Sequence, residues 1–216
     1  MIRFKKNCRR LRVGIDSAKS HFEDFLDAYG YKNLEQARSF AKATEVWIDG
    51  LKEVRFDAEK SIQMLLDVVQ KAGIAKNIDE AEKWLEDNVE ISEESQYIIV
   101  DGNFDLMRLE GADPIIELPD HMSIQGNAEF TFFAGKHLPH GLYVNGSLYL
   151  SHAPNLKELP RSLSVGGDLH IDFTQIESIS AGIFVSGDIY VSAKLEQRTE
   201  ELKKMGKIKG KIFVIG

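Results

Sequence analysis

Residues 163–171 read Leu-Ser-Val-Gly-Gly-Asp-Leu-His-Ile, and variants of this pattern recur through the C-terminal half of the chain. In the best copies, two pairs of alternating apolar residues flank one shared glycine. The other copies are residues 97–106, 122–130, 142–150, 183–191 and 208–214, and the shared glycines are Gly102, Gly126, Gly146, Gly167, Gly187 and Gly210. Successive glycines are 24, 20, 21, 20 and 23 residues apart, which indicates a segment built from repeats.

The alternation within each copy predicts short strands with one buried face. One repeat of ~20 residues then consists of two such strands, a glycine corner and a return through a turn such as Leu138-Pro139 or Leu159-Pro160. A single repeat cannot cover its own apolar edge, so neighbours have to stack and share a core. The sequence therefore predicts a short parallel β-solenoid over residues 97–216, and the alternative is an antiparallel β domain with coincidental spacing.

The first half of the chain, residues 1–96, has the periodicity of short amphipathic helices. Helices are expected over residues 22–29, 33–50, 57–73 and 77–85, with capping residues that include Asn33, Asp57 and Asn77. A further helix is expected at residues 194–205, within the last repeat. The fold class expected is α+β, in which the N-terminal helical bundle packs on or caps the solenoid and the last helix packs near its C-terminal end. Alternatively, the helical half has a binding role of its own.

The unit Leu-Pro-x-x-Leu-x-Val-x-Gly-x-Leu-x-Leu resembles a leucine-rich-repeat-like repeat found in short bacterial and phage proteins. The resemblance covers residues 97–216, with the best copies at 138–158 and 159–178. Residues 127–137 and 192–206 depart from the pattern. The resemblance implies a parallel β-solenoid whose surface recognises a partner, and it implies recognition in preference to catalysis.

Composition and motifs narrow the function classes. The chain has 216 residues, with 27 Lys and Arg against 34 Asp and Glu, and this charge is opposite in sign to that of a dedicated nucleic-acid binder. The single cysteine, Cys8, excludes an internal disulfide and a cysteine-based zinc cluster. No segment has the pattern of a signal peptide or a membrane span, so a cytoplasmic location is expected. No catalytic or phosphate-binding motif occurs, so neither an enzyme nor a cofactor is expected.

The residues that point outward from the predicted strands supply a candidate binding surface. The second strand of each repeat contributes the row Asp105, Glu129, Tyr149, His170, Tyr190 and Phe213, and the first strand contributes Ser123, Tyr143, Ser164 and Phe184. Exposed aromatic rings are enriched at protein interfaces. We expect a protein partner to bind Tyr143, Tyr149, His170, Phe184, Tyr190 and Phe213. The alternatives are that these rings stack on one another, that the helical half covers them, or that they support self-association.

Other polar clusters are less specific. The four histidines His121, His137, His140 and His152 flank the turns, and solvated loops are expected there in preference to a metal site. Asp168 and Asp188 occupy equivalent positions in adjacent repeats. We expect them to be exposed turn residues at the glycine corner. The alternative is a carboxylate pair in which one pKa is raised or a cation is bound.

The first residues of the chain are basic. Their cationic side chains belong to Arg3, Lys5, Lys6, Arg9, Arg10 and Arg12, with no acidic residue among them. This segment either forms a solvated face or pairs with the acidic run at residues 23–27, or it binds phosphates or an acidic partner.

The sequence thus favours a non-enzymatic protein that binds a partner protein through the outward face of the repeats. The alternative is a nucleic-acid or nucleoprotein binder or inhibitor that uses residues 1–12 and the helical half, with the solenoid as a scaffold. An enzyme with its site at His170 has the least support.

Overall fold

The computed structural model describes residues 56–92, 95–106 and 116–216. These residues form two mostly parallel six-stranded sheets and three α-helices, so the expected combination of helices with parallel strands is confirmed. The helices expected at residues 22–29 and 33–50, the basic segment at residues 1–12 and Cys8 lie outside the described residues.

Two helices precede the sheets. Helix α3 (Ala58–Lys71) begins at Asp57, whose carboxylate accepts a hydrogen bond from the Lys60 amide. Helix α4 (Ile78–Asn88) begins at Asn77, whose side chain accepts from the Glu80 amide at 2.9 Å. Both caps are those that the sequence predicts. The apolar faces of the two helices are buried, and the Trp84 ring of α4 lies 5.8 Å from the Phe104 ring of the sheets.

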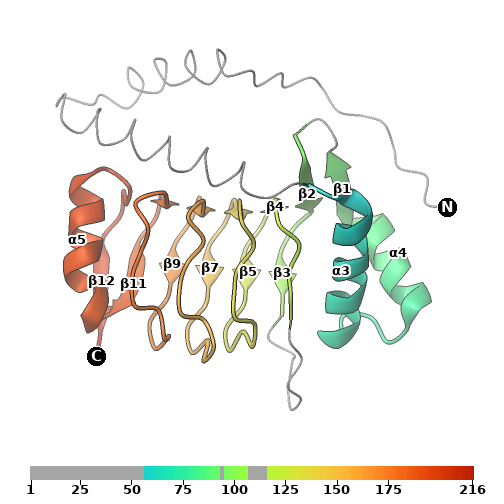
Figure 1. Ribbon diagram of the computed structural model, residues 1–216, viewed down its shortest axis with the longest axis horizontal. Helices are drawn as coiled ribbons and strands as arrows, with labels where there is room; N and C mark the ends of the chain where they lie inside the picture. Colours follow the sequence, from blue (N-terminus) through green and yellow to red (C-terminus); the bar gives the residue numbers. More distant parts are fainter. Residues whose placement is uncertain (1–55, 93–94, 107–115) are drawn as a thin grey trace.

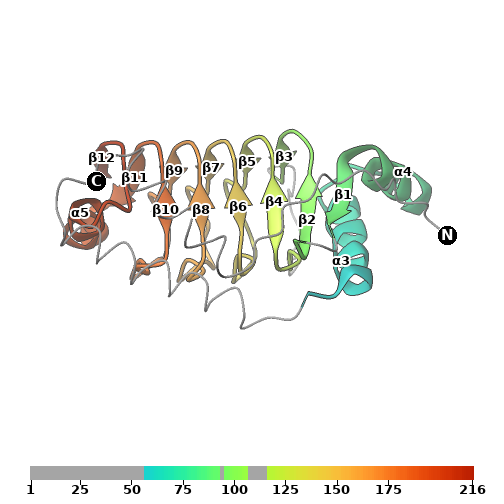
Figure 2. The same cartoon turned by 90° about the horizontal axis from the view of Figure 1, so that it is seen from above.

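The strands alternate between the two sheets along the chain. The first sheet contains, in spatial order, β1 (Val89–Ser92), β2 (Tyr97–Val100), β4 (Met122–Ile124), β6 (Tyr143–Val144), β8 (Ser164–Val165) and β10 (Phe184–Val185). The second sheet contains β3 (Phe104–Asp105), β5 (Ala128–Glu129), β7 (Leu148–Tyr149), β9 (Leu169–His170), β11 (Ile189–Ser192) and β12 (Ile212–Ile215). Figure 2 shows the sheets as two rows that run side by side along the molecule.

Strand pairs join equivalent positions of successive repeats. Leu148 pairs with Leu169, and Leu169 pairs with Ile189, all in parallel register. These side chains are fully buried between the sheets, as are the inward residues of the first sheet such as Val144 and Val165. The core is therefore a set of columns of aliphatic side chains, because the two-residue alternation places every second residue inward.

Strand β1 differs from the sequence expectation. It lies within residues 1–96, the half expected to be helical, and it pairs antiparallel with β2 across the boundary expected at residue 96. The reason is local, since Val89 and Ile91 flank Glu90 in the alternation that suits a strand. The antiparallel hairpin places β1 at the edge of the first sheet, beside the helices (Figure 1).

The shared glycines form a column in which the backbones of successive repeats touch. The Gly126 amide donates to the Gly102 carbonyl at 2.7 Å, and the Gly146 amide donates to the Gly126 carbonyl at 2.9 Å. A Cβ atom on Gly126 would lie 2.6 Å from the Gly102 carbonyl oxygen, closer than real Cβ contacts allow. The glycine is thus required by the close approach of the next backbone.

Beside this column runs a second ladder, which we call the corner ladder and which contains Asn103, Asn127, Ser147, Asp168 and Asp188. Each side-chain oxygen accepts a hydrogen bond from a backbone amide of the following repeat. Asn127 Oδ1 accepts from Ser147, and Asp168 Oδ1 accepts from Asp188 at 2.7 Å. The last member, Asp188, accepts through Oδ1 from the Lys211 amide at 2.6 Å. Asp168 and Asp188 are therefore more than exposed turn residues, because they tie neighbouring repeats together.

A helix also lies at the C-terminal end. After the 3₁₀ turn η1 (Ala193–Leu195), helix α5 (Glu196–Lys204) occupies most of the segment expected at residues 194–205. Figure 1 shows α5 at the end of the strands opposite to α3 and α4.

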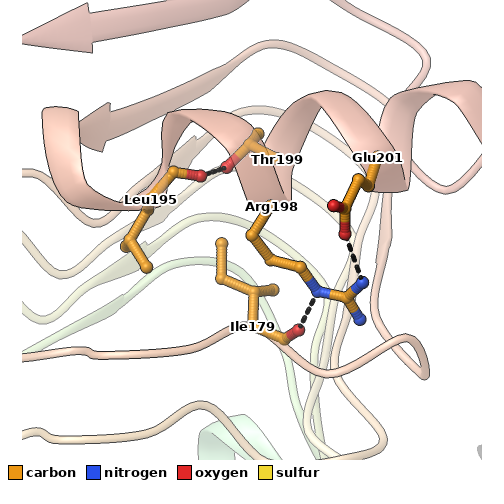
Figure 3. Close-up of polar contacts among 5 residues, drawn as sticks. All are labelled: Ile179, Leu195, Arg198, Thr199 and Glu201. Atoms are coloured by element: carbon orange, nitrogen blue, oxygen red, sulfur yellow. Dashed lines mark hydrogen bonds and ion pairs between the residues drawn. The ribbon is translucent and has the colours of Figure 1, made fainter.

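Arg198 connects this helix to the preceding repeat, and Arg198 and Thr199 also make polar contacts within the helical segment (Figure 3). The Arg198 side chain donates through Nε to the Ile179 carbonyl at 2.9 Å and through Nη1 to Glu201 at 3.0 Å. The Thr199 hydroxyl donates to the Leu195 carbonyl at 2.7 Å. Among the described residues, no helix has the length and apolar character that crossing a membrane demands.

The glycine column gives a direct test. Replacing Gly187 with alanine places a Cβ atom 2.6 Å from the Gly167 carbonyl oxygen, so we expect the free energy of unfolding to fall by about 2 to 4 kcal/mol. The neighbouring Ser186 has an exposed side chain, and Ser186→Ala serves as the matched control with little expected effect. Urea titrations of both variants measure the difference, and equal stability would contradict a backbone contact at Gly187.

Candidate functional site: an aromatic face on the second sheet

The outward residues of the second sheet form the row that the sequence predicts. Strand pairing places Glu129 beside Tyr149, Tyr149 beside His170, and Tyr190 beside both His170 and Phe213. The last four rings stack, with centroid distances of 4.6 Å from Tyr149 to His170, 4.1 Å from His170 to Tyr190 and 4.8 Å from Tyr190 to Phe213. We call Tyr149, His170, Tyr190 and Phe213 the outer ladder.

The outer ladder is both a stack and a surface. Tyr149, His170 and Tyr190 are half-buried, and Phe213 at the end is exposed. Stacking, the alternative that the sequence left open, therefore accounts for part of the burial. The ring edges remain accessible, because neighbouring rings cover one another's faces and leave their outer edges uncovered.

A second aromatic row was not predicted. It contains Phe132, His152 and Phe173, which we call the turn row, at the turns that follow β5, β7 and β9. Its rings also stack, with centroids 5.3 Å apart from Phe132 to His152 and 4.8 Å apart from His152 to Phe173. Phe132 is 62% exposed and Phe173 is 47% exposed, so these are among the most exposed large apolar side chains that the structure describes.

All members of the turn row have left-handed backbones, with φ of 63° at Phe132, 62° at His152 and 54° at Phe173. A bulky residue is rare in this region and costs about 1 to 2 kcal/mol there. The backbone is held by its amides, since Phe132 donates to the Ser151 carbonyl and Phe173 donates to the Ser192 hydroxyl. Asparagine or glycine would fit such turns at lower cost, so exposed phenylalanine is retained against local preference.

Polar side chains separate the two aromatic rows. Ser151, Asp172 and Ser192 lie between them along their strands, two residues after the outer ladder and one residue before the turn. The Ser151 hydroxyl donates to the Asp172 carboxylate at 2.8 Å, and the Asp172 side chain is buried. Together, the outer ladder, the turn row and these intervening residues form what we call the aromatic face. The turn row has a sequence signal that could have revealed it. An aromatic ring stands four residues after the inward residue of each of three strands, and these inward residues are Ala128, Leu148 and Leu169.

The carboxylates around the rings set a negative potential. Burial lowers the pKa of His170 below its usual range, while Asp172 and Asp168 act in the opposite direction. Burial raises the pKa of Tyr190, and Asp168 and Asp188 raise it further. Burial also raises the pKa of Glu129, with a further contribution from the neighbouring Asp105. Burial thus favours the neutral form of His170, and the charge of the face comes from the adjacent carboxylates.

The row on the first sheet does not join this surface. Tyr143 and Phe184 belong to β6 and β10, whose outward faces point away from the second sheet (Figure 2). Ser164 lies between them in the pairing register, so their rings are not adjacent. The six residues expected to bind one partner are thus divided between opposite faces, because successive strands of one repeat belong to different sheets.

Lys207 covers part of Phe184. Its Nζ atom lies 3.8 Å from the centre of the Phe184 ring, and the lysine side chain is 1% exposed. Burial, together with the nearby Lys209, lowers the pKa of Lys207 to about 7. Phe184 is therefore part of the packing at the end of the first sheet, which makes it a poor anchor for a partner.

The histidines do not converge. His121 is buried between the rings of Phe56 and Tyr97, with centroid distances of 6.2 Å and 5.7 Å, so the expected solvated loop is wrong at this position. Tyr97 is itself partly buried, and this burial raises the pKa of its hydroxyl to about 12. His137 is exposed and lies 4.0 Å from Glu158. The part of the chain that the structure describes holds no group of three or more His, Cys, Asp or Glu side chains suited to a metal ion.

A cavity of about 670 Å³ lies between α3 and the Leu-Pro turns. Its charged lining mixes cations with anions, namely Lys60, Lys136, Arg161, Asp57, Glu117, Asp120 and Glu158. This mixture selects neither an anionic nor a cationic ligand, so the aromatic face is the more specific candidate.

Comparisons of the chain with protein-family models, curated proteins and solved structures found no match.

The buried Lys207 predicts a pH dependence of stability. In the folded protein its amine is neutral above about pH 7, whereas in the unfolded chain it takes up a proton below about pH 10.5. Between these values the unfolded state binds more protons, so the free energy of unfolding rises with pH. We expect Lys207→Met to remove this rise and to stabilise the protein at pH 7 by about 2 to 4 kcal/mol.

Chemical denaturation at a series of pH values measures this effect. Lys204→Met, which removes an exposed lysine from α5, is the control and should keep the wild-type slope. A slope that persists in Lys207→Met would show that another group is responsible.

Proposed function

We propose that this protein is a non-enzymatic binding module whose repeats form a solenoid of the leucine-rich-repeat-like kind, with α3 and α4 as a cap at one end and α5 near the other. A protein partner binds its aromatic face. The parallel register of equivalent residues supports the solenoid, and the position of the helices beyond the ends of the sheets supports the caps. The resemblance of the repeat unit to bacterial and phage leucine-rich-repeat-like proteins agrees with a recognition role.

The observation that carries the proposed function is the exposure of the turn row. Phe132 and Phe173 remain exposed although their left-handed backbones favour a smaller residue. Exposed apolar rings that gather in one place mark interaction sites on proteins. An aromatic side chain that is buried at an interface contributes about 2 kcal/mol or more to binding, so the turn row supplies two strong anchors.

The outer ladder extends the same surface. Its half-buried rings offer a continuous apolar strip beside the turn row, and the polar residues between the strips offer hydrogen-bonding groups. Apolar anchors surrounded by polar groups are the usual composition of a protein interface. Because the ladder is already stacked, it is rigid before binding, and little side-chain entropy is lost when a partner covers it.

The turn row separates binding from folding in an experiment. Replacing Phe132 and Phe173 with asparagine removes both rings and suits the left-handed backbone, so the melting temperature should stay within a few degrees of the wild type. Capture of host proteins from a native extract should fall at least tenfold, as expected for the loss of two anchors. Quantitative pull-down and thermal denaturation measure the two effects.

Tyr143→Ser is the matched control, because it removes an exposed ring from the first sheet on the opposite side of the molecule. This variant should capture the same proteins as the wild type. Unchanged capture by the asparagine double variant would contradict a role of the aromatic face, and loss of capture in Tyr143→Ser would place the binding surface on the first sheet.

A further inference from the structure

The charges next to the outer ladder are mostly negative. Next to the outer ladder, the corner ladder places Asp168 and Asp188 two residues before His170 and Tyr190. Asp172 lies between the aromatic rows, and Glu129 continues the outer ladder beyond Tyr149. Two lysines lie at the C-terminal end of these rows. Lys211 follows Asp188, the last member of the corner ladder, and Lys194 donates through Nζ to the carbonyl of Thr174, the residue after Phe173.

Asp168 and Asp188 each have an oxygen available for a partner. Their Oδ1 atoms accept backbone hydrogen bonds within the corner ladder, at 2.7 Å and 2.6 Å. Neither Oδ2 atom takes part in a hydrogen bond or ion pair with the residues that the structure describes. Both aspartates are half-buried, so the backbone contacts hold the carboxylates in place at the surface. A fixed carboxylate loses little entropy when it pairs with a cation.

The two aspartates belong to adjacent repeats. Strands of adjacent repeats are ~4.8 Å apart, so their carboxylates lie side by side along the ladder. Like charges at this separation repel, and a cation placed against them relieves the repulsion. The electrostatic effect extends to the rings, since Asp168 and Asp188 both raise the pKa of Tyr190. The aromatic face therefore combines ring edges and exposed rings with a negative potential.

We infer that the aromatic face binds a basic segment of a partner protein, whose arginine or lysine side chains pair with Asp168 and Asp188 and lie against the neighbouring rings. This inference rests on the proposed function and names the chemistry of its partner. Arginine suits the surface best, because a guanidinium pairs with carboxylates through its edge and stacks on aromatic rings through its face. An acidic protein or a nucleic acid would bring negative charge against these carboxylates, so the same surface repels both.

Two synthetic peptides test the inference, one that alternates arginine with serine and one that alternates glutamate with serine. Each is titrated into the full chain by calorimetry at low and at high salt. We expect the arginine peptide to bind, with an affinity that falls as salt rises, and the glutamate peptide to give no signal. Replacing both Asp168 and Asp188 with asparagine should lower the affinity for the arginine peptide about tenfold.

Asparagine is chosen because it keeps the Oδ1 acceptor of the corner ladder. The chain itself has asparagine at the equivalent positions Asn103 and Asn127, whose Oδ1 atoms accept from the following repeat. The double asparagine variant should therefore melt within a few degrees of the wild type. As a matched control, Glu82→Gln with Glu86→Gln removes the same charge from the exposed side of α4 and should leave peptide binding unchanged.

The results separate this inference from the proposed function. Wild-type affinity for the arginine peptide in the Asp168→Asn, Asp188→Asn variant would overturn the inference, as would tighter binding of the glutamate peptide or of single-stranded DNA. A dimer in light scattering that Phe132→Asn with Phe173→Asn converts to a monomer would identify a second copy as the occupant and would also overturn it. If these two phenylalanines are needed for capture of host proteins but no peptide binds, the proposed function stands and the basic partner does not.

Discussion

The close backbone contact at the glycine column is the constraint on which the rest of this structure depends. From Gly126 onward, each glycine amide donates to the glycine carbonyl of the preceding repeat, and a side chain at these positions would collide with that carbonyl group. The corner ladder beside it satisfies the next amide with an asparagine, serine or aspartate oxygen. Because these contacts fix one residue of every repeat against its neighbour, the strands on both sides of the corner fall into register without long strands to align them.

Register then determines what the surface looks like. A side chain that recurs at one position of the repeat becomes a row, so Tyr149, His170 and Tyr190 stack at distances close to the spacing of strands. The same rule produces the turn row, where the amides of Phe132 and Phe173 hold left-handed backbones in place. Rigid rows of rings are thus a by-product of the stacking that builds the core, and the cost of the turn conformation is met by contacts elsewhere in the repeat.

Asp168 and Asp188 show how one residue serves the fold and the surface together. One oxygen of each carboxylate holds the following repeat, and the other makes no hydrogen bond or ion pair with the described residues. Serine and asparagine perform the structural role in other repeats, so the negative charge is not needed for stacking. The two charges stand two residues before His170 and Tyr190, and this placement is the basis on which we propose a cationic partner.

The sequence by itself determined the parallel strands, their register and the caps of α3 and α4, because alternation, glycine spacing and capping residues act over a few neighbouring positions. It also placed Tyr149, His170, Tyr190 and Phe213 in one row. Only the tertiary structure decided that Tyr143 and Phe184 face the opposite way, that His121 is buried between Phe56 and Tyr97, and that Phe132 and Phe173 are exposed. These properties depend on which sheet a strand joins and on what covers a side chain, and both are set by residues far apart in the chain.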